Sequence, residues 1–156
     1  MDTYRIVLAD DHYLIREGLR SILEEKADLQ VAGEAADGLE LPFLLDQLKP
    51  HLAILDISMP NLQGIETARQ IKMKYPEMKI LMLTMHAERE YLYQAISAEV
   101  EGYLLKEDAP KELLLAIEKI RQGKGFLSPI LKANLEEKHR LLPEFIKFLL
   151  DMMADS

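Results

Sequence analysis

In Tyr4-Arg5-Ile6-Val7-Leu8-Ala9-Asp10-Asp11-His12, a mostly apolar run ends abruptly in two carboxylates, a pattern typical of a buried strand that ends at a polar site. Short apolar runs of this kind recur along the chain between longer segments. They carry too few polar residues for hairpin strands with one face in water, so they predict strands buried on both faces. The predicted strands cover residues 4–9, 29–35, 52–55, 80–84 and 102–105.

The segments between these runs have the length and periodicity of helices. In the first segment, apolar residues recur at spacings of three and four, which predicts one face packed on the sheet. Those residues are Leu14, Ile15, Leu19, Ile22 and Leu23. Alternation of strands and helices over about 125 residues predicts an α/β fold, a doubly wound sheet of five parallel strands with helices on both faces.

Proline and glycine indicate where several helices begin and end. Pro42 interrupts the second helical segment, so this helix either begins late, near Leu41, or is kinked in its first turn. Ala109-Pro110 opens the last helix with proline near its first position, and Gly123 is a suitable residue to end it.

Composition excludes several classes of protein. The 156 residues fit one domain with a short appendage, and 49% apolar with 29% charged residues is typical of globular chains. The formal charge of -8 argues against a general nucleic-acid coat protein. The absence of cysteine excludes disulfides and thiolate chemistry. No apolar stretch approaches the roughly 18 residues of a membrane span, and the N-terminus does not resemble a signal peptide, so we expect a cytoplasmic protein without membrane association.

Polar residues directly follow four of the predicted strands. Asp10 and Asp11 follow the first, Asp56 the third, Thr84 the fourth and Lys106 the fifth. The carboxyl ends of parallel strands lie at one edge of the sheet, so these side chains are expected to converge there. Each alone is weak support, because acidic residues after strands are common helix caps. Five in this order predict a functional site.

Four motifs carry a resemblance to a known family. They are Ile6-Val7-Leu8-Ala9-Asp10-Asp11-His12, Leu55-Asp56-Ile57-Ser58-Met59-Pro60 with Gly64, Leu83-Thr84, and Tyr103-Leu104-Leu105-Lys106. Together they look like the receiver domain of two-component response regulators, over roughly residues 4–122. Arg16-Glu17-Gly18-Leu19 after the first motif is similar to the NarL/FixJ subfamily, whose members usually carry a LuxR-type helix-turn-helix. The resemblance implies a flavodoxin-like fold, a receiver domain over residues 1–125 and a helical tail or linker over residues 126–156.

The resemblance also implies how the strand-end residues act. Asp56 is the expected phosphoacceptor, and Asp11, Asp56 and the backbone carbonyl of Ser58 are expected to bind Mg²⁺ directly, with Asp10 acting through water. This donor set suits Mg²⁺, which prefers oxygen ligands and keeps several waters. Two carboxylates about 4 Å apart repel by about 4 kcal/mol at an effective dielectric near 20, and the metal relieves that repulsion. Without metal, replacing Asp10 or Asp11 by asparagine is therefore expected to stabilise the protein.

Three further residues receive roles from the resemblance. Lys106 is expected to neutralise a phosphoryl oxygen, Thr84 to donate a hydrogen bond to another, and Tyr103 to turn inward when Thr84 moves. The expected partner is a sensor histidine kinase, and phosphorylation is expected to favour a homodimer. Such a protein is not a turnover enzyme, although it promotes its own phosphorylation and dephosphorylation. A hydrolase with a phosphorylated Asp56 is disfavoured, because Asp56-Ile57-Ser58 lacks a second carboxylate two residues on.

The histidines and the fourth helix give weaker indications of function than the strand-end residues. Ser58 and His86 lie two residues beyond Asp56 and Thr84, where they would flank the phosphoryl group, whereas His12, His51 and His139 show no ligand spacing and are not expected to bind metal. The fourth helix is unusually apolar, which core packing and an interaction surface explain about equally well. Its apolar residues are Tyr91, Leu92, Tyr93, Ala95 and Ile96.

The tail over residues 126–156 leaves alternatives open. Ser128-Pro129 is a good helix start, and an apolar stripe follows on a later segment. Its residues are Leu142, Phe145, Ile146, Leu149, Met152 and Met153. The stripe either packs on the receiver domain or mediates dimerisation, or it is a linker with the first helix of a helix-turn-helix. Membrane insertion is disfavoured because the polar face is not basic. The alternative function is a truncated LuxR-type transcription regulator, which binds DNA only if a missing C-terminal helix-turn-helix exists.

Overall fold

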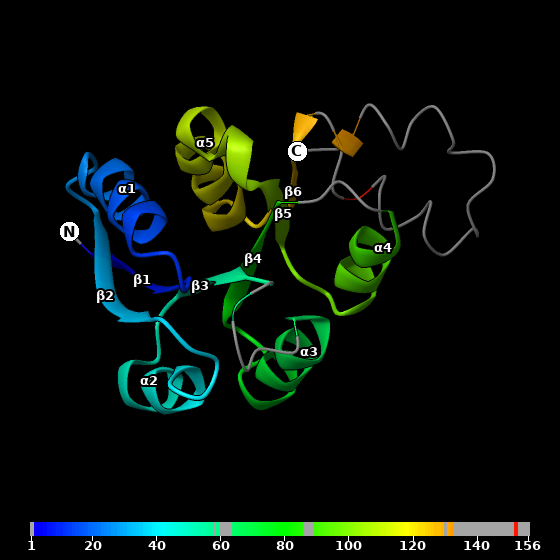
Figure 1. The fold of residues 1–156 in the computed structure, drawn as a ribbon, viewed down its shortest axis with the longest axis horizontal. Helices are drawn as coiled ribbons and strands as arrows, with labels where there is room; N and C mark the ends of the chain where they lie inside the picture. The colour runs from blue at the N-terminus through cyan, green and yellow to red at the C-terminus, as the bar shows by residue number, and fades with distance from the viewer. Residues whose placement is uncertain are drawn as a thin grey trace.

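A parallel sheet with strand order β2-β1-β3-β4-β5-β6 forms the centre of the molecule (Figure 1). The computed structural model describes residues 2–57, 59, 64–85, 89–129, 131, 132 and 152. Within them the strands are β1 (Tyr4–Ala9), β2 (Leu29–Ala35), β3 (Leu52–Asp56), β4 (Lys79–Thr84), β5 (Gly102–Leu105) and β6 (Phe126–Leu127). The five expected parallel strands are confirmed, and the short β6 extends the sheet at one edge.

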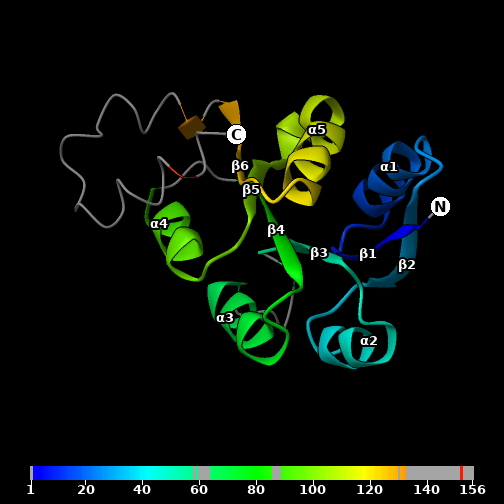
Figure 2. The same ribbon diagram turned by 180° about the vertical axis from the view of Figure 1, so that it is seen from behind.

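Helices cover both faces of this sheet, as expected for a doubly wound fold. They are α1 (Tyr13–Glu24), α2 (Leu41–Leu48), α3 (Gly64–Lys74), α4 (Arg89–Ser97) and α5 (Ala109–Arg121), with the single turn η1 (Lys106–Asp108) before α5. Helices α1 and α5 lie on one face, and α2, α3 and α4 lie on the other (Figures 1 and 2). None of the helices in the described part of the chain is long and apolar enough to cross a bilayer.

Alternate residues of each strand supply two separate hydrophobic cores. Ile6 and Leu8 of β1 pack with α1 and α5, whereas Val7 and Ala9 pack on the opposite side, and all four side chains are buried. Burial on both faces explains why the strand sequences are apolar throughout rather than alternating.

The helix ends agree with the proline and glycine positions. Helix α2 begins at Leu41 with Pro42 in its first turn, so the late start is observed and no helical hydrogen bond is lost to the proline. Helix α5 has Pro110 in its first turn, and Gly123 follows its end with a φ of 83°, a left-handed conformation that glycine adopts readily.

One residue of the expected apolar face of α1 lies in water. Leu14 is 81% exposed, whereas Leu19 and Leu23 are buried, and Ile15 and Ile22 are packed at the edge of the core. The prediction for Leu14 was wrong because an α-helix turns by about 100° per residue, which rotates Leu14 away from the face that Ile15, Leu19 and Leu23 share. In α4, the residues Leu92, Ala95 and Ile96 are buried, and its interaction surface stays a prediction.

The start of the expected tail joins the sheet. Phe126 and Leu127 pair in register with Gly102 and Tyr103 of β5. The Ser128 hydroxyl then accepts a hydrogen bond from the Leu105 N–H at 2.8 Å. These contacts cover the outer edge of β5, which would otherwise expose unpaired backbone groups.

The expected helix start after the sheet is also observed. Pro129 is helical, and the Lys132 N–H donates to the Ser128 carbonyl at 3.0 Å. Leu131 is buried in the core on the α4 side of the sheet. Of the later apolar stripe only Met152 is described, and it is 58% exposed, so the expected role of the stripe falls outside the described residues.

An aromatic and basic cluster lies at the amino edge of the sheet. The Arg5 N–H donates to His51 Nδ1 at 2.9 Å, and the His51 ring stacks on Tyr4 with centroids 5.1 Å apart. The Arg121 guanidinium lies 4.8 Å from the centre of the Tyr4 ring. Burial, followed by the Arg5 and Arg121 charges, lowers the pKa of His51 below 6.5. The folded state therefore favours the neutral ring.

This preference predicts a loss of stability in mild acid. Below pH 6.5 the unfolded chain binds a proton at His51 more readily than the folded chain, so the free energy of unfolding should fall as the pH drops toward the folded pKa. We expect the free energy of unfolding to change by less than about 1 kcal/mol, because His51 remains largely exposed to water, which screens its charge. Guanidinium unfolding at several pH values would measure it against His51→Gln. Identical pH profiles for the two proteins would contradict the prediction.

Candidate functional site

The sheet register brings the ends of four strands to one edge. Asp10 follows β1, Asp56 ends β3, Thr84 ends β4, and Lys106 follows β5. Neighbouring strands end nearly level, since Asp56 pairs with Leu83 and the next residue of β4 pairs with the last residue of β5. The expected convergence at the carboxyl edge is therefore present in the structure.

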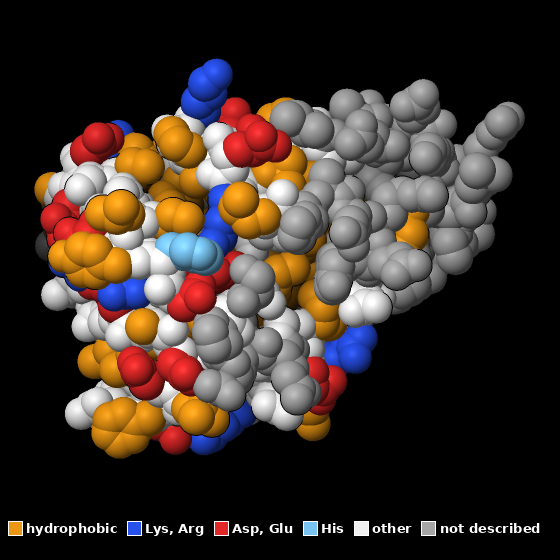
Figure 3. Space-filling view, viewed as in Figure 1, with side chains coloured by type: hydrophobic (Ala, Val, Ile, Leu, Met, Phe, Trp, Pro, Cys, Tyr) orange, Lys and Arg blue, Asp and Glu red, His pale blue; other side chains and the backbone are white. Residues whose placement is uncertain are grey.

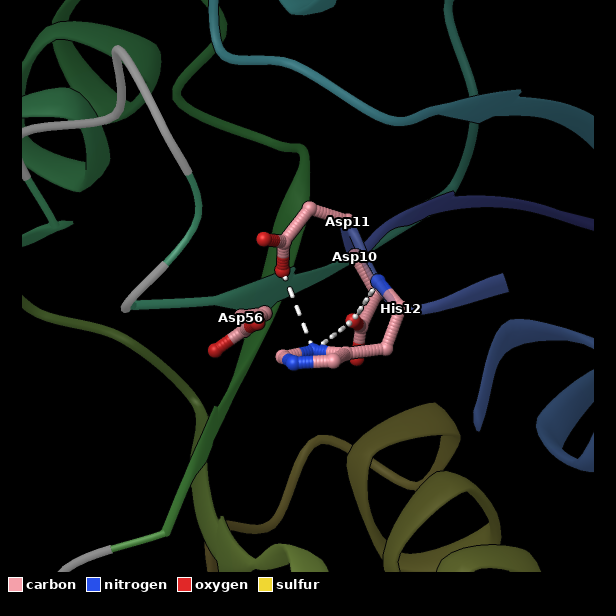
Figure 4. Close-up of side chains that lie close together, drawn as sticks. All are labelled: Asp10, Asp11, His12 and Asp56. Carbon is pink, nitrogen blue, oxygen red and sulfur yellow. Dashed lines mark hydrogen bonds and ion pairs between the residues drawn. The ribbon is translucent and has the colours of Figure 1, made fainter. Parts of the chain in front are cut away.

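Three carboxylates and one imidazole form a tight cluster at this edge. One ligand atom from each of Asp10, Asp11, His12 and Asp56 lies within 4.8 Å of the others. In Figure 4 the three residues after β1 point toward Asp56 on the neighbouring strand. Asp10 and Asp56 are fully buried, whereas the Asp11 side chain is 29% exposed. The pocket thus concentrates negative charge where water has little access.

Lys106 is the cation that neutralises the two buried carboxylates. Its Nζ lies 2.9 Å from Asp56 Oδ2 and 3.0 Å from Asp10 Oδ2, and its side chain is 5% exposed. Burial lowers the pKa of Lys106, but hydrogen bonds and charges from Asp56 and Asp10 outweigh that effect and raise it above 10.5. Lys106 is therefore charged at neutral pH. An isolated buried charge is costly, and each partner here compensates the other.

Backbone contacts hold Asp10 in place. Its N–H donates to the Ala35 carbonyl at the end of β2 at 3.0 Å, and its carbonyl accepts a hydrogen bond from the Arg16 guanidinium at 2.7 Å. Its Oδ1 accepts the His12 N–H at 2.9 Å. His12 is the N-cap of α1, and the helix has no side-chain cap hydrogen bond. Asp10 therefore makes a local hydrogen bond at the start of α1 in addition to its contact with Lys106.

His12 belongs to this cluster, although its sequence spacing does not predict a metal ligand. Its Nδ1 lies 3.1 Å from Asp11 Oδ1 and 3.3 Å from Asp10 Oδ1, and its side chain is 56% exposed. The spacing of the histidines along the chain does not predict a metal site. The position of His12 directly after two strand-end aspartates does indicate that it lies near them. Figure 3 shows a histidine beside acidic and basic side chains on the face viewed there.

The residues present fit a hard divalent cation. Three carboxylates share the cluster, and Lys106 is the cation that contacts Asp10 and Asp56. The buried Asp11 Oδ1 meets only the His12 ring in the described part of the chain. Several carboxylate oxygens close together are the ligands that Mg²⁺ prefers.

The other predicted site residues differ in how far the structure describes them. Thr84 is buried at the end of β4. Tyr103 of β5 is fully buried, with its ring in the core on the α4 side of the sheet. Ser58 and His86 lie outside the described residues, so their roles stay predictions.

Three residues support the pocket from a distance in ways that the sequence does not predict. Arg16 bonds to the Asp10 carbonyl and is itself held by Glu34, and the Ser128 hydroxyl bonds to the end of β5. The sequence predicts Arg16 only as part of a motif and Ser128 only as a helix start. Glu34 carries no local signal, because its partner lies on another element.

The chain is similar to known proteins in both sequence and fold. A family model described as the response regulator receiver domain matches residues 6–118. The uncharacterized transcriptional regulatory protein YxjL of Bacillus subtilis is 38% identical over 134 residues, which cover 86% of this chain and 62% of that protein. The transcriptional regulatory protein DegU of Brevibacillus brevis is 33% identical over 138 residues, which cover 88% of this chain and 58% of that protein. The chain thus spans about three fifths of the length of these two relatives.

Solved structures with the same fold are also similar in sequence. The non-phosphorylated receiver domain of the stress response regulator RcsB from Escherichia coli has a TM-score of 0.77 and 32% identity, covering 81% of this chain and 98% of that one. A LuxR-family two-component response regulator from Aurantimonas has a TM-score of 0.83 and 35% identity, covering 88% and 99%.

The pocket predicts different effects on thermal stability when Asp10 or Asp11 is replaced in the absence of metal. Asp11→Asn should raise the melting temperature in EDTA by roughly 3 °C, about 1 kcal/mol, because it removes one charge from a crowded cluster. Asp10→Asn should not raise it, because Asp10 is a buried partner of Lys106. The structure thus restricts the stabilisation expected from the sequence to Asp11.

Differential scanning calorimetry with EDTA and with excess Mg²⁺ would measure both effects. Asp46→Asn is a matched control, since Asp46 pairs with Lys74 on the exposed surface. A clear loss of stability for Asp11→Asn in EDTA would show that the Asp11 carboxylate stabilises the fold instead of repelling its neighbours.

Proposed function

Because this chain belongs to the family of response regulator receiver domains of two-component signalling systems, we propose that Asp56 accepts a phosphoryl group from the phosphohistidine of a sensor histidine kinase. The observation that carries the proposal is the buried Asp56 carboxylate 2.9 Å from Lys106, beside two further carboxylates. Receiver domains use Mg²⁺ at an acidic pocket and interact with histidine kinases, and an acidic cluster is present here.

The proposed transfer needs positioning and charge neutralisation rather than proton transfer. A carboxylate oxygen of Asp56 forms a bond to phosphorus while the bond from phosphorus to the kinase histidine nitrogen breaks. Lys106 already contacts Asp56 and is placed to pair with a phosphoryl oxygen next to it. A fixed cation in a buried site stabilises developing charge strongly, because little water competes for it.

Mg²⁺ would be held by Asp11, Asp56 and the Ser58 carbonyl, with Asp10 acting through water. When bound, the ion supplies positive charge that lets an anionic carboxylate approach an anionic phosphoryl group. The fit rests on the cluster of three carboxylates, in which the buried Asp11 Oδ1 meets only the His12 ring among the described residues. Ser58 enters only from the family resemblance.

The phosphorylated domain is proposed to act as a switch and not as a turnover enzyme. A phosphoryl group adds roughly -1.5 to -2 charge, which can capture the Thr84 hydroxyl and repack the segment that leads to Tyr103. Thr84 and Tyr103 are both buried, so a small movement of one must be accommodated by its neighbours. Self-phosphorylation and self-dephosphorylation are the only chemistry proposed, and a cytoplasmic location is proposed with the kinase partner.

The proposed output is self-association or docking of a partner. A solved structure of the relative RcsB is described as two dimers bound to two parallel DNAs. Two curated relatives are named transcriptional regulatory proteins, which favours a second candidate function, a LuxR-type DNA-binding regulator. That function requires a helix-turn-helix on the same polypeptide. Reading the coding frame beyond Ser156 tests it directly.

Phosphorylation with a small acyl phosphate tests the assignment of Asp56. Incubation with acetyl phosphate and Mg²⁺ should add the mass of one phosphoryl group to the intact protein. Asp56→Asn should abolish the addition, because it replaces the carboxylate proposed to attack phosphorus by an amide, which is a poor nucleophile. Intact-protein mass spectrometry measures the product.

Two controls separate chemistry from folding. Asp46→Asn should be phosphorylated like the unaltered protein, and EDTA should suppress the reaction in both. Undiminished phosphorylation of Asp56→Asn, or of the unaltered protein in EDTA, would refute the assignment of the acceptor or of the metal, respectively.

A further inference from the structure

Arg16 reaches from α1 back to the acidic pocket. Its Nη1 donates a hydrogen bond to the Asp10 carbonyl at 2.7 Å, and its Nε donates to Glu34 Oε1 on β2 at 2.9 Å. The side chains of Arg16 and Glu34 are only 16% and 18% exposed. Two nitrogens of one guanidinium thus join the edge strand β2 to the residue that follows β1.

Several contacts fix the orientation of this guanidinium. Glu34 accepts from Arg16 through one carboxylate oxygen and pairs with Arg20 through the other, so the glutamate is itself held between two arginines one helical turn apart. The Arg16 guanidinium also lies 5.7 Å from the centre of the Tyr13 ring. Of these two arginines only Arg16 bonds to Asp10. An arginine fork held in this way is rigid, whereas a lysine offers a single mobile donor.

The bond to the Asp10 carbonyl determines how the next residue is presented. This carbonyl belongs to the planar peptide unit whose nitrogen is that of Asp11. The Asp10 N–H, which belongs to the preceding peptide unit, donates to the Ala35 carbonyl at 3.0 Å. Both peptide units that flank the Asp10 Cα are therefore held by hydrogen bonds, which restrains the φ and ψ angles of Asp10 and, through them, the position from which Asp11 extends.

We propose that Arg16, held by Glu34, is a positioning residue that locks the Asp10–Asp11 peptide so that both carboxylates face a divalent cation. The inference rests on the proposed function, because it concerns the same acidic pocket. Groups that orient metal ligands without touching the metal commonly change metal affinity by 10–100-fold when they are removed. Arg16 also adds positive charge near three carboxylates, and the experiment separates that effect from positioning.

Mn²⁺ is a suitable probe, because it prefers the same oxygen ligands as Mg²⁺ and its free ion is measured directly by electron paramagnetic resonance. Arg16→Gln should weaken Mn²⁺ binding by about 10-fold. Arg20→Gln is the matched control, because it also removes an arginine from Glu34 but leaves the Asp10 carbonyl bonded. It should bind Mn²⁺ as the unaltered protein does.

Melting temperatures in EDTA separate positioning from general destabilisation. Both glutamine variants lose a partner of Glu34, so both should lose comparable stability, and only Arg16→Gln should lose metal affinity. Arg16→Lys keeps the charge without the fork and should also bind Mn²⁺ more weakly. Recovery of full affinity by lysine would overturn the positioning role.

A further variant guards against failure of Arg16→Gln to fold. Glu34→Gln leaves Arg16 in place but weakens the ionic contact that orients it, and it should weaken Mn²⁺ binding in the same direction. If the unaltered protein binds no Mn²⁺, the proposed metal site fails. If the unaltered protein binds Mn²⁺ and the Arg16→Gln and Glu34→Gln variants bind it equally well, this inference fails and the proposed function stands.

Discussion

Burial of like charges at one edge of the sheet is the constraint on which the site depends. Asp10 and Asp56 are fully buried, and two carboxylates about 4 Å apart repel by about 4 kcal/mol at an effective dielectric near 20. Lys106 offsets this repulsion by contacting both. Asp11 has no such cation in the described part of the chain, since only the His12 ring is paired with it. The cluster therefore keeps an excess of negative charge, which a divalent ion would neutralise.

The parallel sheet makes this crowding of charge attainable. The central strands β3, β4 and β5 are buried on both faces and end at the same edge as β1, so residues from distant parts of the chain meet without a dedicated loop. The Ser128 hydroxyl and β6 cover the outer edge of β5, next to the strand end from which Lys106 emerges. On the opposite flank, Arg16 and Glu34 hold the end of β1. Contacts on both sides of the pocket thus hold the strand ends that carry Asp10 and Lys106.

Membership of the receiver-domain family and the chemistry of this pocket rest on different grounds. The family follows from a match over residues 6–118 and from solved relatives with TM-scores near 0.8. The chemistry follows from which atoms lie together, above all Asp56 beside Lys106. What the relatives do beyond this domain belongs to those proteins, because the chain spans only about three fifths of YxjL and DegU.

The sequence by itself determined the strands, their parallel arrangement and the residues at their carboxyl ends. Local patterns suffice for these features, because an apolar run buried on both faces and the polar residue that ends it are adjacent in the chain. Asp10, Asp56 and Lys106 were predictable for that reason.

Only the tertiary structure decided which neighbours these residues have. Leu14 is apolar but exposed on the side of α1 that faces away from the core, and His12 turns back onto the carboxylates that precede it. The bridge from Glu34 to Arg16, and the pairing of β6 with β5, depend on strand register and on side-chain directions. Those contacts join segments far apart in the chain, and no local pattern of residues encodes them.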